Sequence, residues 1–136
     1  MAGIVLDNTV GNGGGVTGTS GTVSLAVAGS NRILVAGVFS TAGDLITGAT
    51  YAGSAMTQVN KVQRPGIPTE RWAYLYALIA PNTGTNNCVV SASSSTTMGI
   101  YCASYTNATQ SGQPEANGTN TSILLSIANT LTSTLD

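Results

Sequence analysis

Charged residues are scarce in this chain of 136 residues, where four lysines and arginines and five aspartates and glutamates make up 7% of the sequence. An average soluble domain carries about 25%. Recognition of DNA, RNA or an anionic membrane surface needs clustered lysine and arginine, which four scattered cations do not provide. We therefore expect neither a nucleic-acid partner nor a membrane partner.

Histidine is missing altogether, which excludes Ser-His-Asp and Cys-His catalysis. The two cysteines cannot supply the roughly four ligands of a structural zinc site. Glycoside hydrolysis needs two carboxylates at a defined separation. The five acids of the chain are Asp7, Asp44, Glu70, Glu115 and Asp136. Four of them lie near the termini or in glycine-rich loops. Glu70 lies beside Arg71, and we expect these two residues to form an ion pair. We therefore expect no enzyme activity, no cofactor and no metal.

Long apolar runs are also missing, since no stretch of about 18 apolar residues exists that could form a transmembrane helix. The first ten residues, MAGIVLDNTV, lack the basic start and long apolar stretch of a secretory leader. We therefore expect a protein that stays in the cell that made it or leaves without such a leader, as part of a virus particle does. Low charge gives little protection against association. We favour a surface covered by copies of the chain or by another partner, with a monomer that relies on hydroxyl and amide side chains as the alternative.

What the sequence does contain is a series of short β-like segments. The most informative is Arg71–Ala80, RWAYLYALIA, which is apolar on both alternating faces and ends at the turn sequence Pro81–Gly84. Arg32–Ser40 shares this property. A strand with apolar side chains in both directions is buried on both sides or lies under a neighbouring layer. We therefore expect these two segments to be central strands.

Six further segments have strand composition: Thr22–Val27, Ile46–Ala52, Ala55–Val62, Asn87–Ala92, Met98–Tyr105 and Ser122–Ile127. No segment keeps a helical period with capping residues. Eight or nine short strands at regular spacing predict an all-β, antiparallel β-sandwich of jelly-roll type without a substantial helix. The expected core residues are the apolar side chains at the middle of these segments, namely Ile33, Val35, Trp72, Tyr74, Leu78, Val90 and Ile100.

The N-terminal part is rich in glycine, with GNGGGVTGTSG from Gly11 to Gly21. Such composition is typical of a flexible loop or an extended arm. We therefore predict an arm over residues 1–21, which contacts a neighbouring subunit, and a single sandwich domain over residues 22–136. A phosphate-binding loop is not indicated, because the specific Gly-Lys-Ser/Thr sequence is missing and no helix follows.

The two cysteines, Cys88 and Cys102, are placed symmetrically about Ser95. If Asn87–Ala92 pairs with Met98–Tyr105 around a turn over Ser93–Thr97, the two cysteines lie opposite each other on one apolar face. Opposed strand positions are close enough for contact. A disulfide is then feasible, although such positions often give strained bridges. The alternative is two buried thiols packed as small hydrophobic side chains.

Aromatic side chains are the candidates for contacts with glycans or protein partners, since jelly-roll folds include lectin domains. Those of Arg71–Ala80 share one face, but we expect them in the core because that strand is apolar on both faces. Tyr51, Tyr101 and Tyr105 are better candidates for surface contacts, because a tyrosine can keep its hydroxyl group in water. In the pairing described above, Tyr101 and Tyr105 lie on the face opposite the cysteines.

Four segments occur in an order that has a counterpart elsewhere: ILVAGVF (Ile33–Phe39), ATYAGSAMTQV (Ala49–Val59), RWAYLYALIAPNTGTNNCVVSAS (Arg71–Ser93) and CASYTNATQSGQP (Cys102–Pro114). The series resembles a jelly-roll-like domain of uncharacterised structural proteins from tailed bacteriophages and environmental sequences. The resemblance covers the chain from about Arg32 to Pro114, and it departs from the family at Cys88, where an aliphatic residue is usual. Its motifs are strands and turns, so the resemblance implies a fold and carries over no catalytic residue.

Together, the low charge, the missing catalytic residues and this resemblance predict a non-enzymatic virion structural protein of a tailed bacteriophage. The expected role is a capsid decoration, knob or fibre module that assembles with itself or with capsid or tail proteins. Two alternatives remain, each with an extracellular location. One is a carbohydrate-binding or adhesion module, and the other is a subunit of an extracellular filament.

Overall fold

The computed structural model describes residues 3–64 and 70–111 of the chain. These residues form eight β-strands and no helix, with the bounds β1 (Val5–Gly11), β2 (Val16–Val27), β3 (Ile33–Ser40), β4 (Ile46–Tyr51), β5 (Ser54–Ala55), β6 (Thr57–Arg64), β7 (Arg71–Ile79) and β8 (Gly84–Thr106). Every pair of neighbouring strands is antiparallel. The predicted all-β, antiparallel fold is confirmed. The predicted strand Ser122–Ile127 lies outside the described residues.

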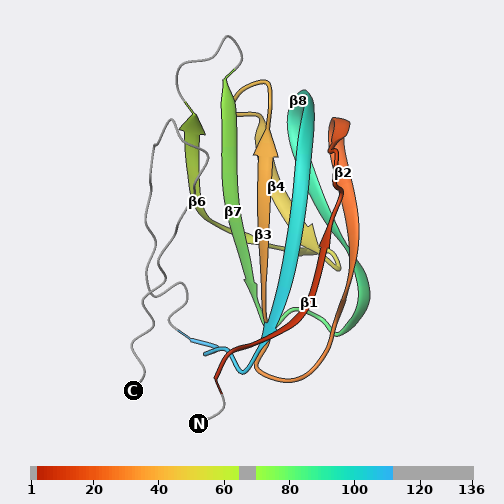
Figure 1. The fold of residues 1–136 in the computed structure, drawn as a ribbon, viewed down its shortest axis with the longest axis vertical. Coiled ribbons are helices and arrows are strands. Elements are labelled where there is room, and N and C mark those ends of the chain that lie inside the picture. Colours follow the sequence, from red (N-terminus) through yellow and green to blue (C-terminus); the bar gives the residue numbers. More distant parts are fainter. Residues whose placement is uncertain (1–2, 65–69, 112–136) are drawn as a thin grey trace.

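The strands form one sheet that folds over into two facing layers (Figure 1). Its order is β5-β4-β8-β3-β7-β6, and β1 and β2 both pair with β8. Residues 98–106 of β8 pair with β3 and β1, and with β7 and β6 they make up what we call the five-strand layer. Residues 84–92 of β8 pair with β2 and β4, and with β5 they make up the four-strand layer. β8 therefore belongs to both layers.

β8 replaces the two strands and the hairpin turn that the sequence predicted around Ser93–Thr97. From Gly18 to Ser20 on β2 the partner changes from Thr96 to Ser91, so a step of two residues matches a step of five on β8. The extra residues bulge outward, and the strand doubles over at one end of the molecule (Figure 1). A tight hairpin turn needs glycine, asparagine or aspartate, and Ser93–Thr97 contains none of them. The two halves of β8 therefore lie in different layers and do not pair with each other.

The N-terminal segment predicted as an arm is part of the sandwich. β1 and β2 run antiparallel to β8 over its whole length, with Val5 opposite Thr106 and Val27 opposite Gly84. The two strands are separated at Asn12, whose side-chain oxygen accepts a hydrogen bond from the Ile100 amide and whose side-chain amide donates to the Met98 carbonyl. The glycines that follow supply the positive φ values of this interruption. The high glycine content therefore reflects a strand interruption and close packing.

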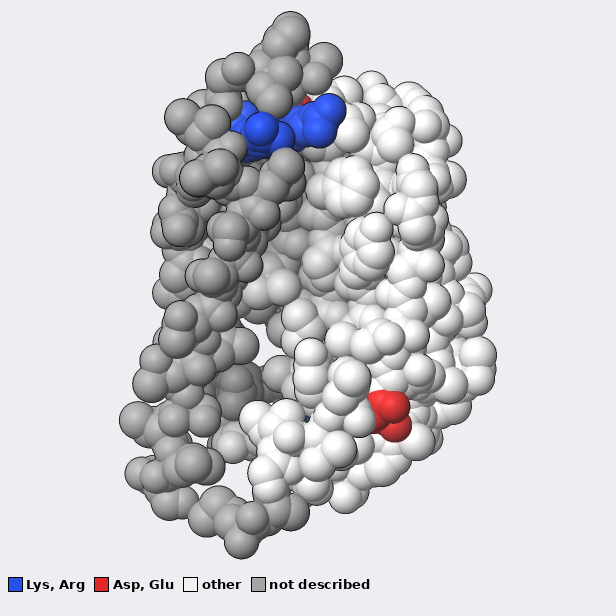
Figure 2. All heavy atoms as spheres, viewed as in Figure 1, with Lys and Arg blue, Asp and Glu red and all other residues white. Residues whose placement is uncertain are grey.

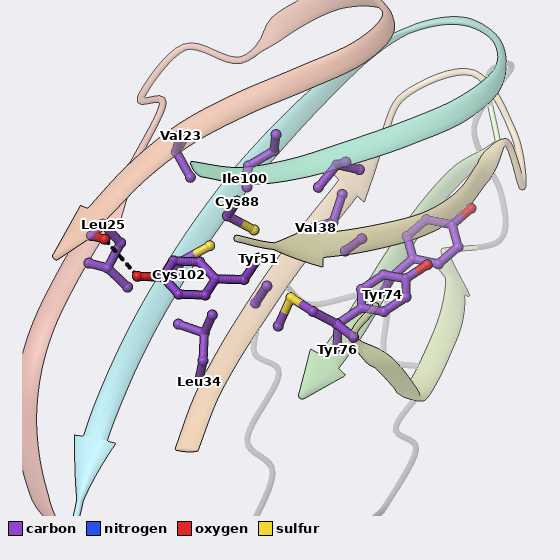
Figure 3. Close-up of a cluster of buried hydrophobic side chains, with 14 of the residues drawn as sticks. Val23, Leu25, Leu34, Val38, Tyr51, Tyr74, Tyr76, Cys88, Ile100 and Cys102 are labelled. Atoms are coloured by element: carbon purple, nitrogen blue, oxygen red, sulfur yellow. Dashed lines mark hydrogen bonds between the residues drawn. The ribbon is translucent and has the colours of Figure 1, made fainter. Parts of the chain in front are cut away.

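The core lies between the layers, where alternate side chains of β2, β3, β4, β7 and β8 meet (Figure 3). Its large, fully buried members include Leu25, Leu34, Tyr51, Val90, Met98 and Ile100. Of the predicted core residues, Tyr74, Val90 and Ile100 are buried, whereas Trp72 and Leu78 are half-buried at its margin. Ile33 and Val35 lie on the opposite face of β3, because its inward residues are Leu34, Ala36 and Val38. A strand that is apolar in both phases does not itself determine which phase faces inward.

β3 and β7 are central strands, as predicted. β3 pairs with β7 and β8, and β7 pairs with β3 and β6. The predicted inward face of β7 is also correct, since Tyr74 and Tyr76 are buried. The outward-facing residues of both strands are only half-buried or exposed. This apolar but partly exposed face is the feature of the fold that bears most directly on function.

Candidate functional site: the outer face of the five-strand layer

The outer face of the five-strand layer is formed by residues that are direct neighbours across four strands. Its members are Leu6, Thr9 and Gly11 of β1; Gly99, Tyr101, Ala103 and Tyr105 of β8; Ile33, Val35, Gly37 and Phe39 of β3; and Ala73, Leu75, Ala77 and Ile79 of β7. None of these residues is charged. The neighbouring arginines, Arg64 and Arg71, pair with each other at one end of the face. Figure 2 shows cationic side chains gathered at one end of the visible surface, beside a wide uncharged area.

The outer face of the four-strand layer has the composition usual for a sheet in water. Its exposed positions on β2 and β8 carry hydroxyl and amide side chains, among them Thr22, Ser24, Asn87 and Ser91. A sheet with one solvated face normally alternates apolar residues inward with polar residues outward. The four-strand layer follows this rule, and the five-strand layer does not. Contiguous exposed apolar surface of this kind marks an interaction site.

The relief of the apolar face comes from aromatic rings that lie over glycines of neighbouring strands. The ring of Tyr101, a residue 49% exposed, covers Gly11, where an added Cβ would come within 2.4 Å of the ring. Its hydroxyl group donates a hydrogen bond to the Gly13 carbonyl, at 3.1 Å. Phe39, which is 37% exposed, covers Gly99 in the same way. Cross-strand contacts of this kind hold both rings in defined positions.

Beside the Tyr101 ring the face is hollowed. At Gly37 an added Cβ would meet only the backbone oxygen of Tyr101, at 4.0 Å. The hollow has a volume of about 610 Å³, and Thr9, Val35, Ala103 and Tyr105 also line it. Small residues therefore form its floor, and aromatic rings form its walls. Such a surface can accept apolar side chains or a flat, uncharged ligand.

The structure separates the three tyrosines that the sequence singled out. Tyr101 and Tyr105 both line the hollow. The prediction for Tyr51 was wrong, because this side chain is fully buried in the core and donates hydrogen bonds to the carbonyls of Leu25 and Gly84, at 2.9 and 3.2 Å. Sequence reasoning missed Phe39, although the strand that contains it is apolar in both phases, which is the signal that could have identified an exposed apolar face.

The cysteines face each other across the interior, one from each half of β8 (Figure 3). They are therefore not opposed neighbours in one ladder, which corrects the predicted pairing. Both are buried free thiols in this structure. Hydrogen bonding with Cys88 and burial raise the pKa of the Cys102 thiol, so it stays protonated at neutral pH. No three metal-ligating side chains gather anywhere in residues 3–64 and 70–111.

A polar cluster lies at the β6–β7 side of the sandwich. Asp44 accepts hydrogen bonds from Lys61 and from the Tyr74 hydroxyl group, the latter at 2.8 Å. The hydrogen bond from Lys61 holds the pKa of Asp44 below its usual value, while burial and Asp44 raise the pKa of Tyr74. Asp44 therefore stays ionised, and no second carboxylate in the described part of the chain joins it. The cluster ties the β3–β4 connection to β6 and β7.

The ion pair predicted between Glu70 and Arg71 does not form, and Lys61–Asp44 is the ion pair found among the described residues. Consecutive side chains at the start of a strand point to opposite faces, which keeps Glu70 and Arg71 apart. Lys61 also lies 5.2 Å from the centre of the Trp72 ring. The indole N–H of Trp72 is buried without a hydrogen-bond partner.

No family model, curated protein or solved structure matches this chain. The described part of the chain has no helix with the length and apolar character needed to cross a membrane.

Proposed function

We propose that this chain is a non-enzymatic structural protein of a tailed-bacteriophage virion. It serves as a capsid decoration, knob or fibre module and assembles, through the outer face of the five-strand layer, with copies of itself or with other virion proteins. The observation that carries the proposal is the uncharged apolar face built by β1, β8, β3 and β7. Placement in a virion rests on the sequence resemblance, and assembly rests on this face.

The physical support for assembly is the cost of leaving this face in water. Leu6, Phe39 and Tyr101 are 55%, 37% and 49% exposed. Each Å² of apolar surface removed from water contributes about 25 cal/mol. The low charge of the chain adds no long-range repulsion between copies. A rigid sheet with fixed aromatic rings also loses little conformational entropy when it binds.

The polar groups of the molecule support a structural role over a catalytic one. Asp44 is engaged by Lys61 and Tyr74, and Asp7 accepts hydrogen bonds from the Ala28 amide and the Ser104 hydroxyl group. These carboxylates hold loops and strands together. A catalytic carboxylate normally faces a cleft, with a second acid or a nucleophile nearby.

Electron microscopy of the native source with gold-labelled antibodies against the recombinant chain tests the proposal. We expect the label at regular positions on phage particles. Label on separate filaments would support the filament alternative. A particle population without label, together with a recombinant protein that forms no assembly of any kind, would refute the proposal.

A carbohydrate-binding or adhesion role is the second candidate, and the exposed Tyr101 ring beside a hollow of about 610 Å³ favours it. The face of an aromatic ring can pack against the C–H groups of a sugar. A glycan array tests this candidate. Binding that is lost in Tyr101→Ala and kept in Thr22→Ala, on the other layer, would support it.

A further inference from the structure

We infer that the partner on the outer face of the five-strand layer is a second copy of this chain, packed face to face about a twofold axis. This inference rests on the proposed function, because it names the partner for the same surface. Three properties of the face carry it: its charge distribution, its relief and its size.

The charge distribution favours a twofold axis that runs across the strands. The ladder positions of the face hold no charged side chain, so two copies can meet without burying an unpaired charge. Arg64 and Arg71 pair at one end, and Leu6 lies near the other. An axis across the strands, placed between the Gly37 and Phe39 rows, carries Arg71 of one copy over the Ala77 row of the other, so the arginines of the two copies lie apart. An axis along the strands would instead leave the arginines of both copies at the same end of the dimer.

The relief is self-complementary under the same operation. Gly37 lies beside Tyr101 in one row of the ladder, and Phe39 lies beside Gly99 in the next row on the same face. An axis between these two rows exchanges them, so that Phe39 of one copy lies over Gly37 of the other. The projecting ring then meets the hollowed position. Such a reciprocal contact is characteristic of an isologous interface, in which residue i meets j and residue j meets i.

The size of the face indicates a weak dimer. Four strands spaced at about 4.8 Å, with about eight residues each at about 3.3 Å, give the whole face an area of roughly 500 Å² per copy. The axis between the Gly37 and Phe39 rows lies near one end of the face, so the second copy covers only part of this area. The buried total is therefore below about 1,000 Å², which is the lower limit for a specific interface. We therefore expect dissociation in the micromolar range or weaker in solution. Repetition of the contact in a particle would raise the overall affinity through multivalency.

The chemistry of the hollow disfavours a sugar as its main occupant. Of the residues that line it, only Thr9 and the two tyrosines carry a side-chain hydroxyl group, and the hydroxyl group of Tyr101 already donates to Gly13. A sugar would bring several hydroxyl groups that need partners once they are removed from water. Apolar side chains of a second copy bring no such requirement.

Sedimentation velocity of the recombinant chain, from micromolar to near-millimolar concentration, tests the inference. We expect a monomer–dimer equilibrium. Phe39→Asp should weaken it at least tenfold, because the dimer would bury an unpaired charge, and Tyr101→Asp should do the same. Thr22→Asp, on the outer face of the four-strand layer, is the matched control and should leave the equilibrium unchanged. Circular dichroism melting verifies that each variant is folded, so that loss of the dimer in either folded variant suffices.

The outcomes separate this inference from the proposed function. A wild-type protein that stays monomeric over the whole range, but is found on particles by gold labelling, overturns the second copy as partner and leaves the virion role standing. A folded Phe39→Asp and Tyr101→Asp pair that both dimerise as wild type also overturns it. If the protein is monomeric and its glycan binding is lost in Tyr101→Ala, the occupant of the hollow is a sugar and not a second copy. Monomeric protein that is missing from the particles refutes both proposals.

Discussion

Removing the hydroxyl group of Tyr51 tests whether this residue is an internal anchor. Tyr51 is fully buried, and its hydroxyl hydrogen is shared between the carbonyls of Leu25 in β2 and Gly84 in β8. A buried hydrogen bond contributes about 1 kcal/mol, and the partner left behind adds part of its desolvation cost. We therefore expect Tyr51→Phe to lower the free energy of unfolding by about 1.5 kcal/mol.

Urea denaturation of the reduced protein measures this loss. With a slope of about 2 kcal/mol per molar urea, the midpoint should fall by roughly 0.75 M. Tyr101→Phe is the matched control, because it removes a hydroxyl group that bonds a single carbonyl at an exposed position. The midpoint of the control should move by less than about 0.25 M. Equal, small shifts in both variants would show that the Tyr51 hydroxyl group is not an internal anchor.

Three further predictions concern the core, a glycine and a carboxylate. Cys88 and Cys102 are buried free thiols, so a thiol reagent should react with neither cysteine in the native protein and with both in non-reducing denaturant. Fewer than two reactive thiols after unfolding would establish a disulfide. Gly21→Ala should lower the free energy of unfolding, measured by urea denaturation, by about 1–3 kcal/mol, because its Cβ would meet the Val16 and Ile100 side chains at 2.7 and 2.8 Å. Gly48→Ala is the control and should not destabilise the protein, because nothing lies within 4 Å of its added Cβ. Equal losses in the two variants would contradict this prediction. The pKa of Asp44 is lowered on folding, so its ion pair contributes stability above the unfolded pKa near 3.8 that is lost as pH falls through the lower, folded value. The effect stays below about 0.5 kcal/mol because Asp44 and Lys61 are exposed, and Asp44→Asn should reduce the difference between urea midpoints at pH 7 and pH 2; an unchanged difference would rule out the contribution.

Much of the fold could be predicted from short apolar strands and their alternation. The strand at Arg71–Ile79 and the faces of β8 are examples, since the Cys88 and Cys102 side chains point inward and Tyr101 points outward. The inward faces of the two halves of β8 came out correctly although their pairing did not. In both arrangements Cys88, Val90, Ile100 and Cys102 belong to the alternation that points inward, so burial is predicted correctly although the pairing is not.

The errors come from positions where local sequence leaves two outcomes of similar cost. Val35 and Leu34 are both good strand residues, and only the facing layer decides which one is buried. The glycines before Gly21 predict a flexible arm, because local sequence gives no sign of their pairing partner, β8, about 80 residues away in the chain. The sequence predicts Tyr51 at the surface because the groups that accept its hydroxyl hydrogen are backbone carbonyls of other strands, which have no sequence signature.

The exposed face was visible in the sequence only as two strands that are apolar on both sides. That property predicts burial on both sides within one chain. The register shows that Gly37, Phe39 and Leu75 share a single outward surface with Tyr101, which depends on long-range pairing of β3, β7 and β8. A second face of this kind is therefore recognised only after the ladder is known.

The pairing of β1 with the end of β8 has a consequence for biosynthesis. Val5 pairs with Thr106, which is translated about a hundred residues later. Until then β1 has no ladder partner, and the five-strand layer is incomplete. Folding must wait for almost the whole of the described domain to be translated, so we expect slow acquisition of structure and a need for protection of the young chain from premature aggregation.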